Sequence, residues 1–218
     1  MKLLAHCSED GRTVRVIEYK LDRSRLYFEG PSLYTHVDAE GNNQLDYVTA
    51  METLLAGEAD VLLLGTAGGA LATRLSRRGV SVTAVDNWPA AFRIAREWFH
   101  LPPEVECVHA DGLAFLKTTP SRWSAIAIDV FDGVEIPAAF FAEGVAATLL
   151  QALKPHGLIV WNVADSALSW TVHRLIKGLR SAGLKPTAFP VLSEDVGNTL
   201  VVCRKPPNLE QIDTDGRT

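Results

Sequence analysis

The chain has 218 residues, a net charge of −5 and 47% hydrophobic residues. These values are ordinary for a globular protein and exclude a disordered, collagen-like or coiled-coil chain. The chain has 21 Lys and Arg but 26 Asp and Glu, so it has no excess of cations to neutralise phosphates. We therefore expect no nucleic acid as a partner.

The three cysteines, Cys7, Cys107 and Cys203, lie far apart and form no C-x-x-C motif. This spacing disfavours a disulfide framework or a zinc knuckle and suits a reducing compartment, so we expect a cytoplasmic protein. The histidines show no H-x-H or H-x-x-x-H spacing, and no metal is expected. No run approaches the ~20 apolar residues that cross a membrane, and the apolar run near residue 1 is too short for a signal peptide.

Residues 1–44 are predicted to form a small N-terminal antiparallel β element. Three β-type runs at residues 13–19, 25–30 and 32–37 are broken by turn residues. Apolar residues then recur at helical spacing from Leu45 to Leu55, which predicts a helix into the next part. The free edge of the β element needs a cover, which favours a homodimer.

Residues 45–205 are predicted to form a Rossmann-like α/β domain with a seven-stranded, mostly parallel sheet. Short apolar runs alternate with helical stretches, as in parallel sheets covered on both faces. We expect strands at residues 61–65, 80–86, 105–111, 124–130 and 157–163, and helices near 69–78, 88–99, 111–117, 137–154 and 166–182. Two later runs flank a turn at Gly197 and Asn198 and predict an antiparallel hairpin at one sheet edge. Residues 206–218 are expected to be a flexible tail.

The ends of the first two predicted strands favour a nucleoside-type ligand, because ligands of open parallel sheets bind beyond the carboxyl ends of the strands. The first strand runs into a turn of small residues that lets a ligand approach the backbone, although such residues also suit a tightly packed joint. The turn consists of Gly65, Thr66, Ala67, Gly68 and Gly69. The second strand ends at Asp86, whose carboxylate can accept hydrogen bonds from both ribose hydroxyls. Asn87 and Trp88 follow it and could cover the adenine, or Trp88 could simply open a helix.

The next two strands also end in acids. The third ends in Asp111 and Gly112, where the carboxylate can accept a hydrogen bond from the adenine amine, and the fourth ends in a D-x-x-D formed by Asp129 and Asp132. Folds that bind nicotinamide dinucleotides usually continue in parallel, whereas class I S-adenosylmethionine-dependent folds close the sheet with an antiparallel strand. The acids and the predicted hairpin therefore favour S-adenosylmethionine, with a dehydrogenase as a minor alternative.

The sequence resembles the polyamine aminopropyltransferase (spermidine synthase) family within the class I fold over about residues 25–203. The resemblance rests on VLLLGTAGGALA, AVDNWP, HADGLAFL, IAIDVFDG and LKPHGLIVWN. A turn at Phe28-Glu29-Gly30 matches the L-D-G-like turn of the family, and Tyr47 matches the tyrosine of its Y-x-E-M helix start. The resemblance implies that Asp129 and Asp132 are catalytic, with Asp132 also holding substrate, and that Tyr47 roofs the substrate cleft. Tyr34 is a second candidate for that roof, with packing of the β element as the alternative.

Two departures from the family bear on the cofactor. The aminopropyltransferases carry an acid where this chain has Gly68, and the glutamate of their Y-x-E falls at Thr49. Decarboxylated S-adenosylmethionine has a propylammonium that an acid would pair with, whereas S-adenosylmethionine adds a carboxylate to which free N–H groups at Gly68 would donate hydrogen bonds. We therefore expect methyl transfer to an amine or hydroxyl. Aminopropyl transfer in polyamine biosynthesis and a non-catalytic nucleoside binder are the alternatives.

The expected chemistry is an in-line displacement at a sulfonium, which requires a positioned nucleophile with a free lone pair. A primary amine has a pKa of about 10 and is protonated at neutral pH. A carboxylate such as Asp129 would bind the ammonium and then take its proton. Asp132 would hold the cationic end, or would cap the turn before Gly133. The expected partner is therefore a small-molecule acceptor, most simply an amine.

Overall fold

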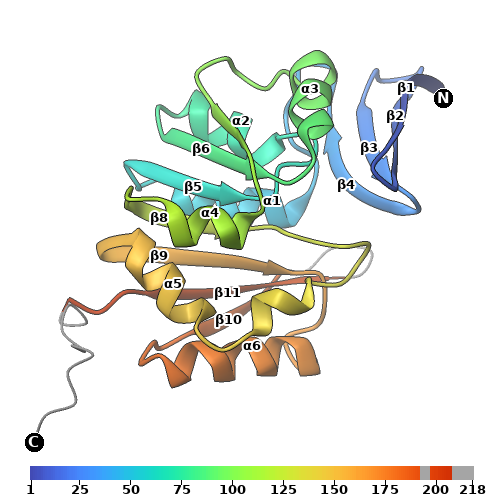
Figure 1. Ribbon diagram of the computed structural model, residues 1–218. Helices are drawn as coiled ribbons and strands as arrows, with labels where there is room; N and C mark the ends of the chain where they lie inside the picture. Colours follow the sequence, from blue (N-terminus) through green and yellow to red (C-terminus); the bar gives the residue numbers. More distant parts are fainter. Residues whose placement is uncertain (192–196, 208–218) are drawn as a thin grey trace, which may run out of the picture.

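Two β-sheets organise the computed structural model, which describes residues 1–191 and 197–207 (Figure 1). One is a four-stranded sheet in the order β1-β2-β3-β4, and the other is a seven-stranded sheet in the order β10-β11-β9-β8-β5-β6-β7. Most of the predicted C-terminal turn and most of the predicted tail lie outside the described residues.

The N-terminal sheet is an antiparallel meander of β1 (Lys2–Glu9), β2 (Arg12–Glu18), β3 (Arg25–Glu29) and β4 (Ser32–Val37). The prediction of three strands missed β1. No residue of β1 is buried, and its apolar residues run consecutively from Leu3 to Ala5 rather than alternating with polar ones. Strand β2 shows the expected alternation, because Val14 and Val16 are buried while Arg15 is exposed. The homodimer predicted from the edge of this sheet stays a prediction.

The larger sheet confirms the predicted Rossmann-like architecture. Its parallel strands are β5 (Asp60–Leu64), β6 (Ser81–Asp86), β7 (Glu106–His109), β8 (Trp123–Ile128) and β9 (Leu153–Val163). The hairpin of β10 (Thr187–Val191) and β11 (Asn198–Arg204) adds two antiparallel strands at one edge. The chain moves one way from β5 to β7 and the other way from β8 to β9, so the switch point lies between β5 and β8. Such a switch point is where open α/β sheets bind ligands.

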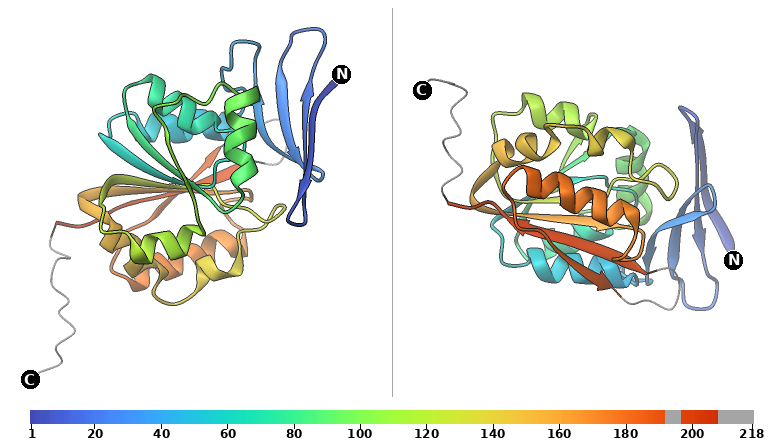
Figure 2. Two further views of the ribbon diagram at one scale, coloured as in Figure 1. Left: turned by 45° about the horizontal axis from the view of Figure 1, so that its top comes forward. Right: turned by 90° about the horizontal axis from the view of Figure 1, so that it is seen from below.

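Helices cover both faces of this sheet (Figure 2). One core cluster includes residues of α1 (Asp46–Leu55), α2 (Ala70–Arg77) and α3 (Pro89–Trp98), and the other includes residues of α4 (Gly112–Thr118), α5 (Val145–Ala152) and α6 (Trp170–Ser181). The long helix predicted over residues 137–154 is wrong in one respect. The segment is divided into a 3-10 helix, η1 (Ala138–Phe141), and α5. Gly144, with a φ of +88°, precedes α5, and β9 already starts at Leu153.

The N-terminal sheet lies beside the carboxyl ends of the parallel strands (Figure 1). Its buried residues Val14, Val16 and Tyr27 belong to the same core cluster as α1 and α3. The Tyr27 ring lies 6.1 Å from the ring of Phe99, and Arg25 Nη1 donates a 2.7 Å hydrogen bond to the Trp98 carbonyl oxygen. The two sheets therefore meet across a continuous apolar contact, with the strand ends facing it.

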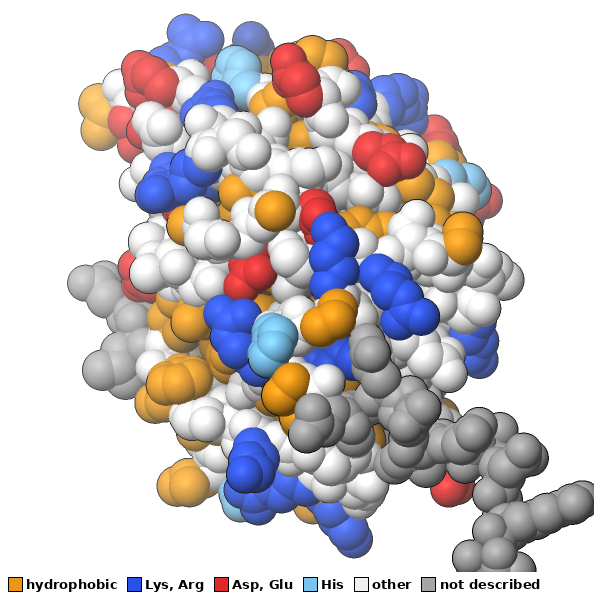
Figure 3. Space-filling view, turned by 90° about the vertical axis from the view of Figure 1, so that its left-hand side faces the viewer, with side chains coloured by type: hydrophobic (Ala, Val, Ile, Leu, Met, Phe, Trp, Pro, Cys, Tyr) orange, Lys and Arg blue, Asp and Glu red, His pale blue; other side chains and the backbone are white. Residues whose placement is uncertain are grey.

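The amino-terminal ends of the parallel strands, on the side of the larger sheet away from the N-terminal sheet, face the viewer in Figure 3. Acidic and basic side chains are interspersed there. Within the described part of the chain, the helices are all too short or too polar to cross a membrane. Cys7, Cys107 and Cys203 are free thiols. The cytoplasmic location inferred from them stays a prediction.

Candidate active site

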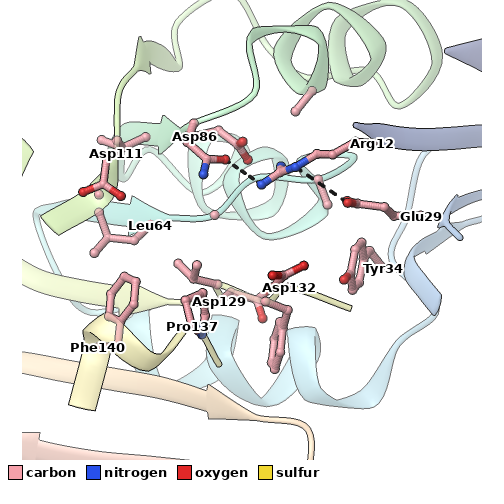
Figure 4. Close-up of a pocket in the computed structure, with 18 of the residues that line it drawn as sticks. Arg12, Glu29, Tyr34, Leu64, Asp86, Asp111, Asp129, Asp132, Pro137 and Phe140 are labelled. Carbon is pink, nitrogen blue, oxygen red and sulfur yellow. Dashed lines mark hydrogen bonds and ion pairs between the residues drawn. The ribbon is translucent and has the colours of Figure 1, made fainter. Parts of the chain in front are cut away.

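A cavity of about 440 Å³ lies between the carboxyl ends of the parallel strands and the N-terminal sheet (Figure 4). It brings together ten of the fourteen residues singled out from the sequence. These are Tyr34, Tyr47, Gly65, Ala67, Asp86, Asn87, Asp111, Gly112, Asp129 and Asp132. The other four, Thr66, Gly68, Gly69 and Trp88, do not line it. Residues that are up to 98 positions apart in the sequence thus form one site at the switch point.

The turn after β5 has a backbone that only glycine can supply at its first position. Gly65 has a φ of +85°, and a Cβ on it would lie 2.2 Å from the carbonyl oxygen of Asp129. Its N–H donates to Val85 O at 2.9 Å, while the Asp129 N–H donates to Leu64 O at 2.9 Å. This close approach sets the end of β8 directly beside the end of β5, and Asp129 is thereby placed in the cavity.

The next part of the turn is closed by the N-terminal sheet. The Gly68 N–H donates to Thr35 Oγ1 at 3.0 Å, and a Cβ at position 68 would lie 2.8 Å from Thr35. The Gly68 N–H, which was expected to donate a hydrogen bond to a ligand carboxylate, is therefore already satisfied. Gly69, with a φ of +74°, precedes α2 and packs against Leu101, which is a structural role.

Asp86, which was predicted to hold a ribose, lies on one side of the cavity. Its Oδ2 accepts the Thr66 N–H and its Oδ1 accepts the Trp88 N–H, both at 2.9 Å. Burial raises the pKa of this carboxyl, while the backbone donors and the nearby Arg12 act in the opposite direction. The carboxylate is thus fixed in orientation, with lone pairs left for ribose hydroxyls. Trp88 is 2% exposed and lies in the core directly before Pro89, so it opens α3 and does not cover the ligand.

Asp111 and Asn87 complete that side. Asp111 Oδ1 caps α4 by accepting the Ala114 N–H at 2.8 Å, which leaves the second carboxylate oxygen for a ligand. Figure 4 places Asp111 beside Leu64 and Phe140, on the opposite side of Asp86 from Arg12. An apolar wall next to a fixed hydrogen-bond acceptor suits a purine with an exocyclic amine.

Asp129 lies on the other side of the cavity, at the end of β8. Its Oδ1 accepts a 2.8 Å hydrogen bond from Asn162 Nδ2. Burial raises the pKa of Asp129 to about 6, and hydrogen bonds from Asn162 and Tyr47 oppose part of that rise. A carboxylate with this pKa is ionised at neutral pH and accepts a proton more readily than an exposed one.

The loop after β8 is held against the N-terminal sheet. Asp132 and Glu135 exchange backbone hydrogen bonds of 2.8 and 3.2 Å, and the Asp132 side chain lines the cavity. The Tyr34 hydroxyl donates to the Gly133 carbonyl oxygen, and its ring stacks on Phe131 at 6.4 Å. Tyr34 therefore both lines the cavity and packs the sheet against the loop.

Arg12 and Glu29 are two charged cavity residues that were not singled out from the sequence. Arg12 Nη2 donates a 2.9 Å hydrogen bond to Asn87 Oδ1, and its Nε lies 3.7 Å from Glu29 Oε1 (Figure 4). Glu29 belongs to the turn matched to the family, which was an available signal. Arg12 carried none, because only the docking of the N-terminal sheet brings β2 to the cavity.

The charges of the lining residues determine which ligands suit the cavity. Six of them are acidic and one, Arg12, is basic. Such an imbalance favours cations, and both a sulfonium and an ammonium carry a positive charge. The nucleoside-type acids Asp86 and Asp111 and the acidic pair Asp129 and Asp132 lie on separate sides, so the cavity has room for a nucleoside next to a cationic group.

Comparisons with known proteins agree with this arrangement. No family model matches the chain. The chain is 31% identical over 179 residues to a polyamine aminopropyltransferase from Chromobacterium violaceum, spanning 77% of this chain and 66% of that protein. It is 24% identical over 157 residues to an N-terminal histidine N-methyltransferase from Emericella nidulans, spanning 67% of this chain but 28% of that protein. The chain thus spans less than two thirds of either relative.

A solved structure supports the fold. A probable spermidine synthase from Corynebacterium glutamicum superposes with a TM-score of 0.75 at 17% identity, covering 94% of this chain and 81% of that one. The alignment with the aminopropyltransferase, the antiparallel closing strands and the N-terminal sheet all agree. The chain therefore has the class I S-adenosylmethionine-dependent methyltransferase fold and is similar in sequence to a polyamine aminopropyltransferase.

Proposed function

We propose that this protein is an S-adenosylmethionine-dependent transferase that moves a methyl group to a small-molecule amine. The observation that carries the proposal is the single cavity in which Asp86 and Asp111 lie across from Asp129, whose pKa of about 6 suits a general base. The relatives include an aminopropyltransferase and an N-methyltransferase, which supports group transfer as the kind of reaction.

The cavity residues fit the cofactor. Asp86 would hold the ribose hydroxyls, Asp111 the adenine amine, and Gly65 and Ala67 would let the sulfur-bearing chain pass close to the backbone. When bound, S-adenosylmethionine supplies an electrophilic methyl carbon on a sulfonium that leaves as a neutral thioether. Proton handling and positioning are left to the protein.

The acceptor side of the cavity suits an amine. Asp129 would bind the ammonium form and take its proton, which frees the lone pair for attack. Asp132 and Glu29 add negative charge for the rest of a cationic acceptor. A hydroxyl acceptor would gain nothing from these additional acids, so the amine is preferred.

Methyl transfer is preferred to aminopropyl transfer because of the turn at Gly68. Thr35 fills the space in which a side chain at position 68 would lie, at 2.8 Å from the Cβ of any such side chain. The turn therefore offers no acid to a propylammonium. Arg12 instead supplies a cation at the cavity, for which the cofactor carboxylate is a natural partner. Aminopropyl transfer is supported by the retained Asp129 and Asp132 and remains the second candidate.

Calorimetric titration with S-adenosylmethionine, its decarboxylated form and methylthioadenosine tests the proposal. We expect S-adenosylmethionine to bind at least about tenfold more tightly than the decarboxylated form, a difference of about 1.4 kcal/mol. Asp86→Asn is expected to weaken all three ligands, whereas Asp46→Asn, an exposed acid in the first turn of α1, is the matched control and should bind as the wild type does.

The other outcomes are equally clear. A preference for the decarboxylated cofactor would replace methyl transfer by aminopropyl transfer. Absence of binding for all three ligands would contradict both transferase proposals. If S-adenosylmethionine binds, incubation with a panel of mono- and diamines and mass spectrometry of the products identifies the acceptor by its added methyl group.

A further inference from the structure

Two asparagines form a chain of hydrogen bonds that ends on Asp129. Asn162 Nδ2, on β9, donates to Asp129 Oδ1 at 2.8 Å, and Asn198 Nδ2, on β11, donates to Asn162 Oδ1 at 2.9 Å. Asn162 is 1% exposed, so its amide is almost fully removed from solvent. The three residues come from separate strands and meet only because β11 pairs with β9 beside β8.

The orientation of the Asn162 amide decides what it does to Asp129. A side-chain amide presents two N–H donors at one end and an oxygen acceptor at the other, and an ionised carboxylate only accepts. When Nδ2 points toward Asp129, the amide stabilises the carboxylate. If Oδ1 pointed there instead, the amide oxygen would repel the carboxylate. The Asn198 N–H binds Oδ1 on the far side and therefore selects the stabilising orientation.

We propose that Asn198 is a positioning residue that orients the amide of Asn162 and so holds Asp129 in the ionised, proton-accepting form. This inference rests on the proposed function, since Asp129 is there the base. It assigns a task to the antiparallel hairpin, whose residue Asn198 is connected to Asp129 through Asn162. Asn198 itself does not line the cavity.

Other groups that act on the charge of Asp129 stay in place when Asn198 is changed. Asp129 shares the cavity with titratable and charged groups from several elements. These are Asp10 from the β1–β2 turn, Arg12 from β2, Tyr27 and Glu29 from β3, Tyr34 from β4, Tyr47 from α1, Asp86 from β6, Asp111 at the start of α4, and Asp132 from the loop that also holds Asp129. None of them is hydrogen-bonded to Asn198 in the described structure. A change at Asn198 is therefore transmitted through Asn162.

The first test follows the ionisation of Asp129 in the ligand-free protein by carboxyl ¹³C NMR, with Asp129→Asn assigning the resonance. Asn198→Ala removes the donor, and its Asp129 pKa is expected to rise by about one unit, a tenfold change in the protonation equilibrium. Asn198→Asp keeps the shape but turns the donor into an acceptor, so the Asn162 amide should reverse and the rise should be larger. Melting temperatures check that both variants are folded.

The matched control is Thr199→Val. Thr199 neighbours Asn198 on β11, and its hydroxyl donates to Asp165 O at 2.7 Å, so the substitution disturbs the same hairpin without touching the asparagine chain. The Asp129 pKa is expected to stay unchanged in this variant. An equal rise in Thr199→Val would overturn the proposal in favour of a general effect of the hairpin.

The second test uses turnover, once an acceptor is known. The acidic limb of kcat/KM for the amine should move to higher pH in Asn198→Ala, with about a fivefold loss at pH 6 that approaches about tenfold below pH 5. The loss should disappear by pH 9, and KM for the cofactor should not change. A purely structural defect would instead lower activity equally at every pH.

Two results would overturn the inference. An unchanged Asp129 pKa in both Asn198 variants, with a rise in Asn162→Leu, would mean that Asn162 acts alone. An unchanged pKa in all three would mean that the asparagines do not act on Asp129. The NMR titration needs neither cofactor nor acceptor. Failure of the proposed function would therefore appear as missing binding or turnover, while the effect of Asn198 on the pKa of Asp129 would still be measured.

Discussion

Asp129→Asn is expected to lower kcat/KM for the acceptor amine by about 10²- to 10⁴-fold, the usual contribution of a positioned general base. The amide has nearly the shape of the carboxylate but can neither pair with the ammonium nor take its proton. The dissociation constant of S-adenosylmethionine should change little, because Asp86 and Asp111 hold the nucleoside. Initial rates and calorimetry on the same preparation separate the two effects, and unchanged turnover would contradict the assigned base.

The same substitution should make the protein more stable near neutral pH. Because burial raises the pKa of Asp129 to about 6 in the folded chain, the folded state binds this proton more tightly than the unfolded state does. The stabilisation is fully present below about pH 4, the pKa range of an exposed Asp, and is lost as the pH rises through 6. The Asn variant does not ionise, so we expect a gain of about 1–2 kcal/mol at pH 8 that fades by pH 4.

Urea unfolding at both pH values measures this gain, with Asp46→Asn as the control that should show none. Lower activity combined with higher stability is the signature of a residue kept for chemistry rather than for packing. A loss of stability at pH 8 would instead indicate that Asp129 is structural.

Gly65→Ala is expected to destabilise the fold strongly, by about 2–5 kcal/mol. A left-handed backbone costs a non-glycine residue about 1–2 kcal/mol, and overpacking adds about 1–3 kcal/mol. The second contribution arises because the new Cβ would lie 2.2 Å from Asp129 O and 2.8 Å from its carbonyl carbon, both backbone atoms.

Gly79→Ala is the matched control. Its φ of +81° is close to the +85° of Gly65, but nothing lies within 4 Å of a Cβ there. We therefore expect a loss of about 1–2 kcal/mol and normal ligand binding. Urea unfolding compares the two variants, and equal losses would show that contact with Asp129 contributes nothing. Any folded Gly65→Ala protein should also lose activity, since β8 and Asp129 must move together.

Most of the α/β domain followed from the sequence because its signals are local. An apolar run such as residues 61–65 has side chains buried on both faces of the sheet, and it is followed by the predicted helix, α2. The errors occur where local signals are weak. Strand β1 buries no residue, so nothing in its pattern marks it, and Gly144 breaks a stretch whose apolar spacing otherwise continues as a helix.

The site was predictable where it follows strand ends and not where it depends on docking between sheets. Asp86, Asp111 and Asp129 each close a strand, and parallel strands bring their carboxyl ends together. Arg12 reaches the cavity only through the placement of β2, and Thr35 reaches Gly68 from β4, 33 residues earlier. The state of the Gly68 N–H therefore could not be inferred from the turn alone.

The cavity also has a consequence for how such a protein can change over time. Its nucleoside side is built from β5, β6 and the start of α4, whereas Arg12, Glu29 and Tyr34 come from the antiparallel sheet. Substitutions on β2 to β4 can therefore alter which acceptor binds, while the half of the cavity built from β5, β6 and α4, which is proposed to bind the nucleoside, keeps its sequence. A new acceptor can therefore be accommodated through substitutions on β2 to β4, with Thr35, whose hydroxyl accepts the Gly68 N–H, as the position at which both halves must change together.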